Sequence, residues 1–365
     1  MNLEAIRAGL PVCERYAYLN AGTFGPLPAR TVAAMAAHQE ERLVQGRAGM
    51  PWFLSLMASR EELRAELARV IGARTGSVAI TSSTTEGCNA VVAGLRLKAG
   101  DQVVTTDVEH PGLRGALKAW DLDVRTAGVG AAPAADALEI VRGEVTPETR
   151  LIALSHVTWT TGQVLPIREL GELGPPLLVD GAQSVGAIPV DVSELGCDFY
   201  TVSGQKWLLG PDATGGLYVR PDWTERLQLT YPSYLSWEDT AELVPWPNAR
   251  RFESLFTPTA SVAGLLESLA FAREAGVERF AEARAMAERC RELVGERCLV
   301  VTEPGQATLV SFRLPEGPRE ELEARLEEQR VVIRDLPGTG WARASCGFWT
   351  SEDDLQRLVA ALEPL

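Results

Sequence analysis

The chain has 365 residues, enough for two ordinary domains, with the apolar and charged fractions of a globular protein. Its formal net charge of −14 argues against nucleic acid and anionic membrane surfaces as partners, and no apolar run reaches the length that crosses a bilayer. The six cysteines are sparse and form no CxxC pair, so we expect reduced thiols and no metal site. Because the N-terminus has no secretion signal, we expect a cytoplasmic protein.

Short β-rich runs alternate with helical patterns from about residue 55 to residue 275. This alternation predicts an α/β fold with a mostly parallel central sheet flanked by helices. Ligands of such folds bind at the carboxyl ends of the strands. The predicted helices span 54–71, 85–97 and 112–120, and the predicted strands span 77–81, 102–106, 151–157, 176–180, 197–203 and 215–219.

The pattern changes from about Pro258 onward. A long helix over 260–274 is followed by Arg- and Glu-rich helical stretches, by strand candidates at 298–302, 308–314 and 331–336, and by a helix from Ser351. These elements predict a smaller C-terminal α+β domain of a size that can form its own core. We therefore divide the chain into a large domain, residues 15–257, and a small domain, residues 258–365 together with 1–14.

Lysine occurs at three positions only, 98, 118 and 206, and every other cation is arginine. Lys98 and Lys118 fit ordinary surface positions. Lys206 follows a predicted strand among apolar and aromatic residues, where desolvation should lower its pKa and leave a nucleophilic amine. Asp180 ends another predicted strand, LLVD. From the residues alone, it is equally suited to cap the next helix and to be the counter-ion of a cationic ligand.

Asp180 in DGAQ and Lys206 in SGQK, 26 residues later, resemble the class V aminotransferase family of fold-type-I pyridoxal 5'-phosphate (PLP) enzymes. The resemblance runs from YLNAGTFGPLP (18–28) to RASCGFWTSEDDL (343–355). It implies that PLP is bound through an imine to Lys206, while Asp180 pairs with the protonated ring nitrogen and so allows the ring to accept electrons. It also implies a small amino-acid substrate and a homodimer with active sites at the subunit interface.

A candidate phosphate site lies in TSSTTEG, where Thr84 and Thr85 stand between a strand and a helix. Hydroxyls and free N–H groups at a helix start bind anions, although an ordinary helix cap explains the same residues. The resemblance favours the phosphate, and Ser203 and Gln205 match positions that complete its site. Thr257 resembles a threonine that reaches the phosphate from the other subunit, although the stretch before it is one residue longer than in desulfurases.

Three further side chains are assigned by the resemblance. His110, in DVEHPG, is expected to stack on the pyridine ring and assist proton transfer, although a lone histidine is usually a polar surface residue. Trp159 stands where desulfurases have an asparagine near the phenolic oxygen of the cofactor, and a core tryptophan is an equally good interpretation. Gln183 can still donate to that oxygen.

Arg343, in WARAS, is the candidate for binding the substrate carboxylate. A guanidinium matches a carboxylate through two parallel hydrogen bonds, and the resemblance implies this role, whereas a surface ion pair is the alternative. Ala21 and Gly22 resemble the loop that closes over the substrate. The freed Lys206 amine is expected to act as general base, helped by His110.

The reaction is the least constrained part of the prediction. A desulfurase of this family needs a nucleophilic cysteine on a loop before the carboxylate-binding arginine, and residues 329–341 contain none. Cys346 lies beyond Arg343, where core packing is expected. We therefore predict β-elimination by a cysteine or cystine C–S lyase. The alternatives are a class V aminotransferase, then a cysteine desulfurase or an epimerase, and last a PLP-binding module without catalysis.

Overall fold

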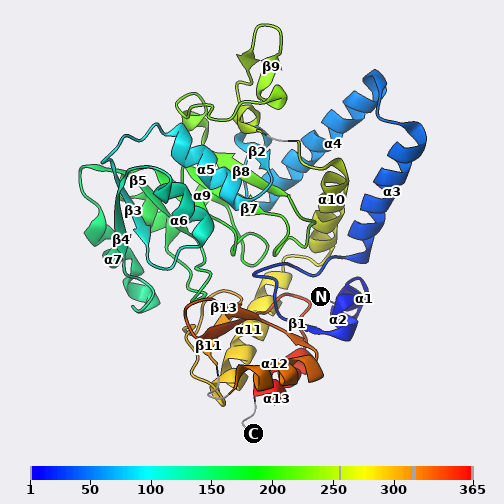
Figure 1. The fold of residues 1–365 in the computed structure, drawn as a ribbon, viewed down its shortest axis with the longest axis vertical. Coiled ribbons are helices and arrows are strands. Elements are labelled where there is room, and N and C mark those ends of the chain that lie inside the picture. The colour runs from blue at the N-terminus through cyan, green and yellow to red at the C-terminus, as the bar shows by residue number, and fades with distance from the viewer. Residues whose placement is uncertain (1, 255, 315–317, 363–365) are drawn as a thin grey trace.

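The computed structural model describes residues 2–254, 256–314 and 318–362, and its largest element is a seven-stranded sheet (Figure 1). The strand order is β2-β8-β7-β6-β5-β3-β4, in which β8 is antiparallel to both neighbours and every other adjacent pair is parallel. The strands are β2 (Val78–Thr81), β3 (Gln102–Thr106), β4 (Asp123–Ala127), β5 (Thr149–Ser155), β6 (Leu177–Asp180), β7 (Phe199–Ser203) and β8 (Gly215–Val219).

The central strands are buried on both faces because helices cover both sides of the sheet. Along β6 the side chains alternate: Leu177 and Val179 join the apolar cluster on one face, and Leu178 joins the cluster on the other. The helices of this part are α3 (Ala29–Gln45), α4 (Gly49–Val70), α5 (Thr84–Gly94), α6 (Pro111–Lys118), α7 (Ala137–Glu144), α8 (Ile167–Gly171), α9 (Val192–Leu195) and α10 (Thr259–Glu274).

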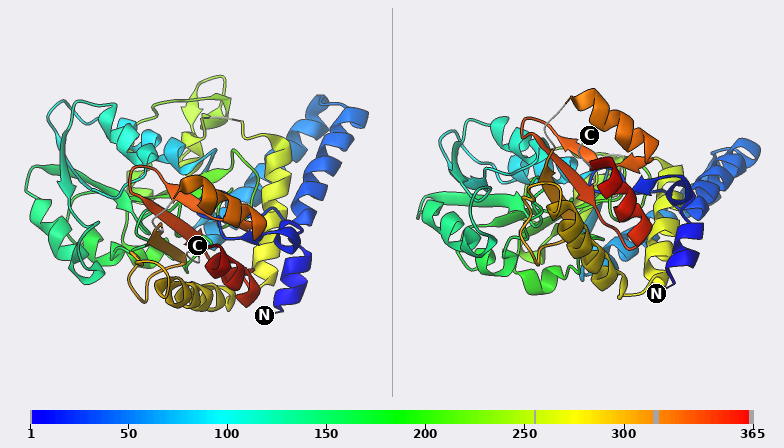
Figure 2. Two further views of the ribbon diagram at one scale, coloured as in Figure 1. Left: turned by 60° about the horizontal axis from the view of Figure 1, so that its bottom comes forward. Right: turned by 90° about the horizontal axis from the view of Figure 1, so that it is seen from below.

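A smaller α+β part lies below the large sheet in Figure 1. Its antiparallel sheet has the order β11-β14-β13, with β11 (Leu309–Arg313), β13 (Arg334–Leu336) and β14 (Trp341–Ser345). Figure 2 shows this part from below with its helices, which are α11 (Arg279–Gly295), α12 (Arg319–Glu328) and α13 (Glu352–Leu362). Beside them lie the N-terminal elements α1 (Leu3–Ala8), α2 (Val12–Arg15) and β1 (Ala17–Tyr18), the last of which pairs with β12 (Val331–Val332).

The remaining elements are short. A hairpin projects from the top of the molecule in Figure 1 and consists of β9 (Trp237–Asp239) and β10 (Val244–Pro245). The 3-10 helices are η1 (Thr75–Ser77), η2 (Ala134–Asp136), η3 (Pro221–Trp223), η4 (Tyr234–Ser236) and η5 (Ala249–Phe252). None of the helices in the described residues is long and apolar enough to cross a membrane.

The predicted fold class is confirmed: the large sheet is mostly parallel and flanked by helices, and the C-terminal part is α+β. The division at residue 258 stays a prediction. Helix α10, which follows it, packs against α3 and α4, and its Val262 and Leu265 belong to the apolar cluster of the large sheet. A fourth apolar cluster, with Trp207 and Trp349 among its members, joins the two parts.

Two strand predictions are wrong. Residues 298–302 form no strand: an isolated bridge joins Val300 to Phe312, and a few backbone hydrogen bonds to Ser311 and Arg313 of β11 accompany it. The Thr302 hydroxyl accepts the Ser311 amide at 2.8 Å, so a side chain takes the place of a ladder carbonyl. The predicted strand 331–336 divides at Ile333, because β12 pairs with β1 while β13 pairs with β14.

Candidate active site

The predicted site residues of the large part follow the ends of neighbouring strands. Asp180 is the last residue of β6, Lys206 comes three residues after β7, and His110 comes four residues after β3. Because these strands are parallel, their carboxyl ends meet at one edge of the sheet, where ligands of α/β proteins bind. The charges of Asp180 and Lys206 both act on the pKa of His110, so the structure brings these three groups together.

Lys206 is half-buried, and burial lowers its pKa to about 8, against the opposing effect of Asp180. The N-terminal loop lies directly on this residue: a Cβ atom at Gly25 would lie 2.0 Å from the Lys206 carbonyl oxygen. The Gly25 amide also donates to the Gln205 carbonyl at 2.8 Å. A lysine with a pKa near 8 keeps a substantial fraction of neutral amine at neutral pH, as imine chemistry requires.

Asp180 is buried and uses one carboxylate oxygen, Oδ1, to accept the Ala182 amide at 2.9 Å. Within the residues that the structure describes, Oδ2 accepts no hydrogen bond. No helix begins directly after Asp180, so the helix-cap alternative does not apply. Asp180 Oδ2 is therefore free to accept a hydrogen bond from a protonated ring nitrogen.

The turn between β2 and α5 presents several free amides. Ser83 caps the helix, since its hydroxyl accepts the Glu86 amide at 3.1 Å. The amides of Ser83, Thr84 and Thr85 have no acceptor within the described part of the chain. Together with the positive end of an 11-residue helix, they make an anion site.

Ser203 and Gln205 lie beside this turn. Gly215 of β8 pairs with Thr81 on one side and with Ser203 on the other, so the ends of β2 and β7 are one strand apart. The Ser203 hydroxyl donates to Gln205 Oε1 at 2.9 Å. Thr257 is buried, with 4% of its surface exposed, in the segment between η5 and α10. Its contact with a phosphate in another subunit stays a prediction.

His110 and Trp159 pack edge to face, with ring centroids 5.3 Å apart and an interplanar angle of 82°. His110 Nδ1 accepts the Gly112 amide at 3.1 Å, which is compatible with a neutral ring that carries its proton on Nε2. Burial and then the Lys206 charge lower the pKa of His110. Trp159 is only partly buried, so it lines the site instead of filling a core.

Arg343, in β14, is 1% exposed, which excludes a surface ion pair. Its Nη1 donates to the Trp159 carbonyl at 2.7 Å, whereas its buried Nε has no acceptor in the described residues. Burial, and then the Arg334 charge, lower its pKa to about 9. A Cβ atom at Gly22 would lie 2.5 Å from Nη2, so only glycine lets the loop that contains Ala21 and Gly22 lie on this guanidinium.

The sequence matches the aminotransferase class-V family model over residues 17–358. The chain belongs to this family. It is 30% identical to isopenicillin N epimerase of Streptomyces clavuligerus, over 95% of this chain and 94% of the relative. It is also 28% identical to a cysteine desulfurase of Klebsiella pneumoniae, over 99% of this chain and 98% of the relative.

Among solved structures, the chain resembles two of the protein C-DES, each at 30% identity with a TM-score of 0.91. One is a mutant with glycine covalently linked to its PLP cofactor, covered over 98% of both chains. The other is described as the cystine C–S lyase in complex with its product cysteine persulfide, covered over 97% of this chain and 98% of that one. Both likenesses extend over the large and the small part.

Gln183 has two bonds in this class V chain that its sequence position did not predict. Its Nε2 donates to the Gly22 carbonyl at 2.8 Å, and its Oε1 accepts the Trp207 indole N–H at 3.0 Å. The Gln183 amide therefore connects the loop of Ala21 and Gly22 with Trp207, the residue after Lys206. One N–H remains, so its predicted bond to the cofactor's phenolic oxygen stays a prediction.

Sequence reasoning missed Arg334. It lies in β13 directly opposite Arg343 of β14, it is exposed, and its charge acts on the pKa of both Arg343 and His110. Its guanidinium forms no hydrogen bond or ion pair within the described ranges. The pairing of β13 with β14 places Arg334 there, and the sequence did not indicate it because residues 331–336 resemble one continuous strand.

Sequence reasoning also missed Glu109, and it assigned His156 a structural role. Glu109 is buried next to His110 and accepts from both the amide and the hydroxyl of Ser155, at 3.0 and 2.5 Å. Burial raises its pKa to about 7. His156 lies 2.7 Å from the Tyr200 hydroxyl, and burial lowers its pKa to about 4. A neutral, buried ring bonded to a core tyrosine agrees with a structural role.

Proposed function

We propose that this chain is a PLP-dependent C–S lyase that cleaves cysteine or cystine by β-elimination. One observation carries the proposal. The charges of Asp180 and Arg343 both act on Lys206, a half-buried lysine of lowered pKa, and the buried Arg343 has no carboxylate partner in the described residues. An amine, a ring-nitrogen counter-ion and a carboxylate anchor are what a PLP enzyme needs for an α-amino acid. The cofactor is PLP.

The free atoms of the site fit this cofactor. Lys206 would hold its aldehyde carbon, Asp180 Oδ2 would pair with the ring nitrogen, and His110 would contact the ring. The free amides at Thr84 and Thr85 would bind the phosphate, together with Ser203 and Gln205. Thr257 is assigned to the phosphate of the partner subunit. When bound, PLP supplies an electron sink for the bond broken at Cα.

Substrate orientation comes from the small part. Arg343 binds the α-carboxylate, with Ala21 and Gly22 closing over it. The Lys206 amine would take the Cα proton, and the neutral His110 would accept or return it. Trp159 lines the pocket for the side chain. β-Elimination would release the β-sulfur as a thiolate from cysteine or as a persulfide from cystine, so cystine and water would yield pyruvate, ammonia and cysteine persulfide.

Two features favour a lyase over the other reactions. Residues 329–341 contain no cysteine, and Cys346 is buried against Cys290 in the small core, so neither supplies a sulfur-accepting thiol on the loop before Arg343. The second feature is Arg334, which adds a second guanidinium beside Arg343. A substrate with two carboxylates, such as cystine, would match this pair.

The finer assignments are a homodimer and a cytoplasmic location. Several large apolar side chains are exposed, which supports a partner subunit: Phe24, Leu27, Tyr231, Tyr234 and Phe256. Six free thiols, five of them buried, suit a reducing compartment. Sedimentation of the purified chain at micromolar concentration tests the dimer.

A product assay tests the reaction. The chain is loaded with PLP and given L-cystine, L-cysteine and L-alanine in separate reactions. A lyase releases pyruvate, ammonia and persulfide sulfur from cystine in equal amounts. A keto acid that retains sulfur would identify a transaminase, and a D-amino acid without ammonia would identify an epimerase, for which the 30% identity to isopenicillin N epimerase is the argument. Either result contradicts the lyase.

A further inference from the structure

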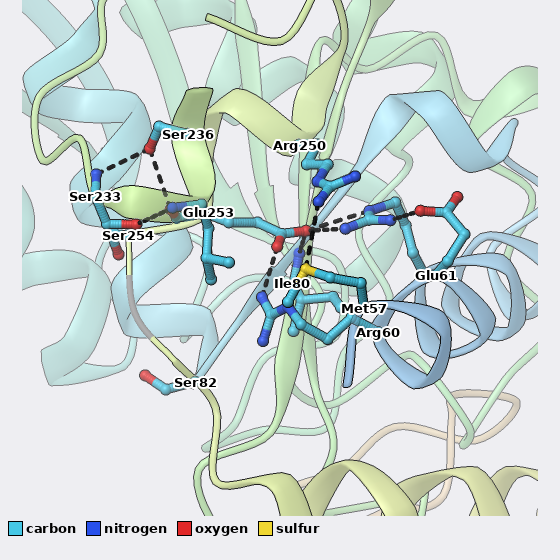
Figure 3. A network of polar contacts seen from close by, with 12 residues as sticks. Met57, Arg60, Glu61, Ile80, Ser82, Ser233, Ser236, Arg250, Glu253 and Ser254 are labelled. Atoms are coloured by element: carbon cyan, nitrogen blue, oxygen red, sulfur yellow. Dashed lines mark hydrogen bonds and ion pairs between the residues drawn. The ribbon is translucent and has the colours of Figure 1, made fainter. Parts of the chain in front are cut away.

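A second group of buried charges lies behind the phosphate turn, outside the site described above. Glu253 is fully buried, and its carboxylate accepts from Arg60 at 2.5 Å and from Arg64 at 2.6 Å (Figure 3). The same carboxylate accepts the Ile80 amide of β2 at 3.2 Å. Two hydroxyls bind its carbonyl oxygen, those of Ser233 (2.9 Å) and Ser236 (3.2 Å). Residue 253 is therefore held from both its side chain and its backbone.

Ser254, the next residue, connects this anchor with the turn. Its hydroxyl donates to Glu86 Oε1 in the first turn of α5. The other oxygen, Glu86 Oε2, accepts the amide and the hydroxyl of Ser82, at 2.6 and 2.7 Å. Ser82 and Ser254 are both labelled in Figure 3. Glu86 is thus held between the anchored segment and the residue that precedes the helix cap.

The position of the Glu86 carboxylate is unusual for a helix start. Glu86 is the third residue of α5, and the Ser83 hydroxyl accepts its amide, which is half of a capping box. In a complete box the carboxylate would accept the Ser83 amide in return. Here it reaches one residue further back, to Ser82. The Ser83 amide consequently has no acceptor in the described chain, and the amides of Thr84 and Thr85, in the first turn of the helix, have none either.

From this geometry we infer that Ser254 is a positioning residue for cofactor binding. By holding Glu86 against Ser82, it keeps an internal carboxylate off the amides that bind the phosphate. Without the Ser254 hydroxyl, Glu86 can turn to the Ser83 amide and complete the capping box, which brings its negative charge next to the Thr84 and Thr85 amides, where it repels the phosphate. The inference rests on the proposed PLP function and adds a residue that touches neither cofactor nor substrate.

The test compares two ligands that differ only in the phosphate. PLP and pyridoxal both react with Lys206, and their dissociation constants are measured by visible absorbance on the full chain freed of cofactor. Ser254→Ala should weaken PLP binding about tenfold, the effect of one hydrogen bond to a charged group, and leave pyridoxal binding unchanged. The double variant Ser254→Ala with Glu86→Gln should recover most of the PLP affinity, because the competing charge is gone.

Ser236→Ala is the matched control, since it removes a hydroxyl that binds the Glu253 carbonyl but leaves the bond between Ser254 and Glu86 intact. Its ratio of PLP to pyridoxal affinity should equal that of the wild type. The inference is overturned if Ser254→Ala binds PLP as the wild type does, if both ligands weaken equally, or if the Glu86→Gln change gives no recovery. A wild type that binds no PLP at all would instead refute the proposed function, so the two failures are distinguishable.

Discussion

The molecule contains two groups of buried charge that differ in how completely they are paired. Around Glu253, a carboxylate meets Arg60 and Arg64 and accepts a backbone amide as well. Around Lys206 and Arg343, two cations share a site in which Asp180 is the near carboxylate, and within the described residues Arg343 donates to a carbonyl and a hydroxyl but to no carboxylate.

This difference separates structure from function. Burying a charge costs several kcal/mol unless partners compensate for it, so folding alone favours the paired arrangement around Glu253. The incompletely paired group is retained at a cost in stability, which is typical of a binding site whose missing partners are ligand groups. Changes in the first group should therefore affect stability, and changes in the second should affect binding and turnover.

Removing Lys206 should have the largest effect on function. Lys206→Ala deletes the amine that binds the aldehyde and moves the proton, so turnover should fall by at least about 10³-fold. The visible absorption band of protein-bound PLP should disappear, whereas the melting temperature of the cofactor-free chain should not fall. Lys118→Ala, a change in an exposed lysine, is the control. A retained band in Lys206→Ala would refute the central assignment.

The paired group should respond in the opposite way. Glu253→Gln removes the negative charge and leaves Arg60 and Arg64 buried without a counter-ion, so the free energy of unfolding should fall by about 3–5 kcal/mol. Denaturant titration of the cofactor-free chain measures this loss. Glu61→Gln removes the exposed partner of Arg64 and should cost under about 1 kcal/mol. Equal losses in the two variants would contradict the comparison.

Replacing Arg343, a member of the incompletely paired group, tests its proposed role in binding the substrate carboxylate. Arg343→Lys keeps the charge but loses the planar fork that binds a carboxylate through two bonds. We expect kcat/KM to fall about 10- to 100-fold, mostly through KM, with the visible band of bound PLP unchanged. Arg313→Lys, at the exposed end of β11 in the same sheet, is the control. A loss of the visible band in Arg343→Lys would mean that this residue binds the cofactor.

The sequence predicted the elements whose residues face a core. The buried strands β5, β6 and β7 are apolar runs; Lys206 was singled out by its residue type and position, and Asp180 was assigned by the family resemblance. The strand β4 was missed because it lies at the sheet edge and four of its five residues are exposed or partly exposed, so its residues carry no apolar pattern. Strand 298–302 was predicted from β-branched residues, but a side-chain hydrogen bond interrupts its ladder.

The site shows the same division. Local motifs predicted Lys206, Asp180, Thr84 and Arg343, but contacts between distant segments could not be read from the chain. The Ser254 bond to Glu86 joins residues 168 positions apart, and Arg334 faces Arg343 only because β13 and β14 pair. Glu109, whose pKa burial raises, likewise accepts hydrogen bonds from Ser155, 46 residues away.

Glu109 sharpens the comparison, because it is a single carboxyl with neutral partners close to the incompletely paired group. Burial raises its pKa to about 7, from an ordinary value of 4.5. Between these values the folded chain holds a proton that the unfolded chain has lost, so Glu109 contributes stability that is present below about pH 4.5 and is lost as the pH rises toward 7. Glutamine cannot titrate and should remove this loss.

The free energy of unfolding of Glu109→Gln minus that of the wild type should therefore increase between pH 4.5 and 7, by on the order of 1–3 kcal/mol, and become constant above that range. Urea titrations of the cofactor-free chain at constant ionic strength measure it. Glu148→Gln is the control: a hydrogen bond from Thr146 lowers the pKa of that exposed carboxyl, so its difference should change in the opposite direction and at lower pH. If the difference in free energy of unfolding between Glu109→Gln and the wild type does not change with pH, the pKa of Glu109 is not raised in the folded chain and the prediction is wrong.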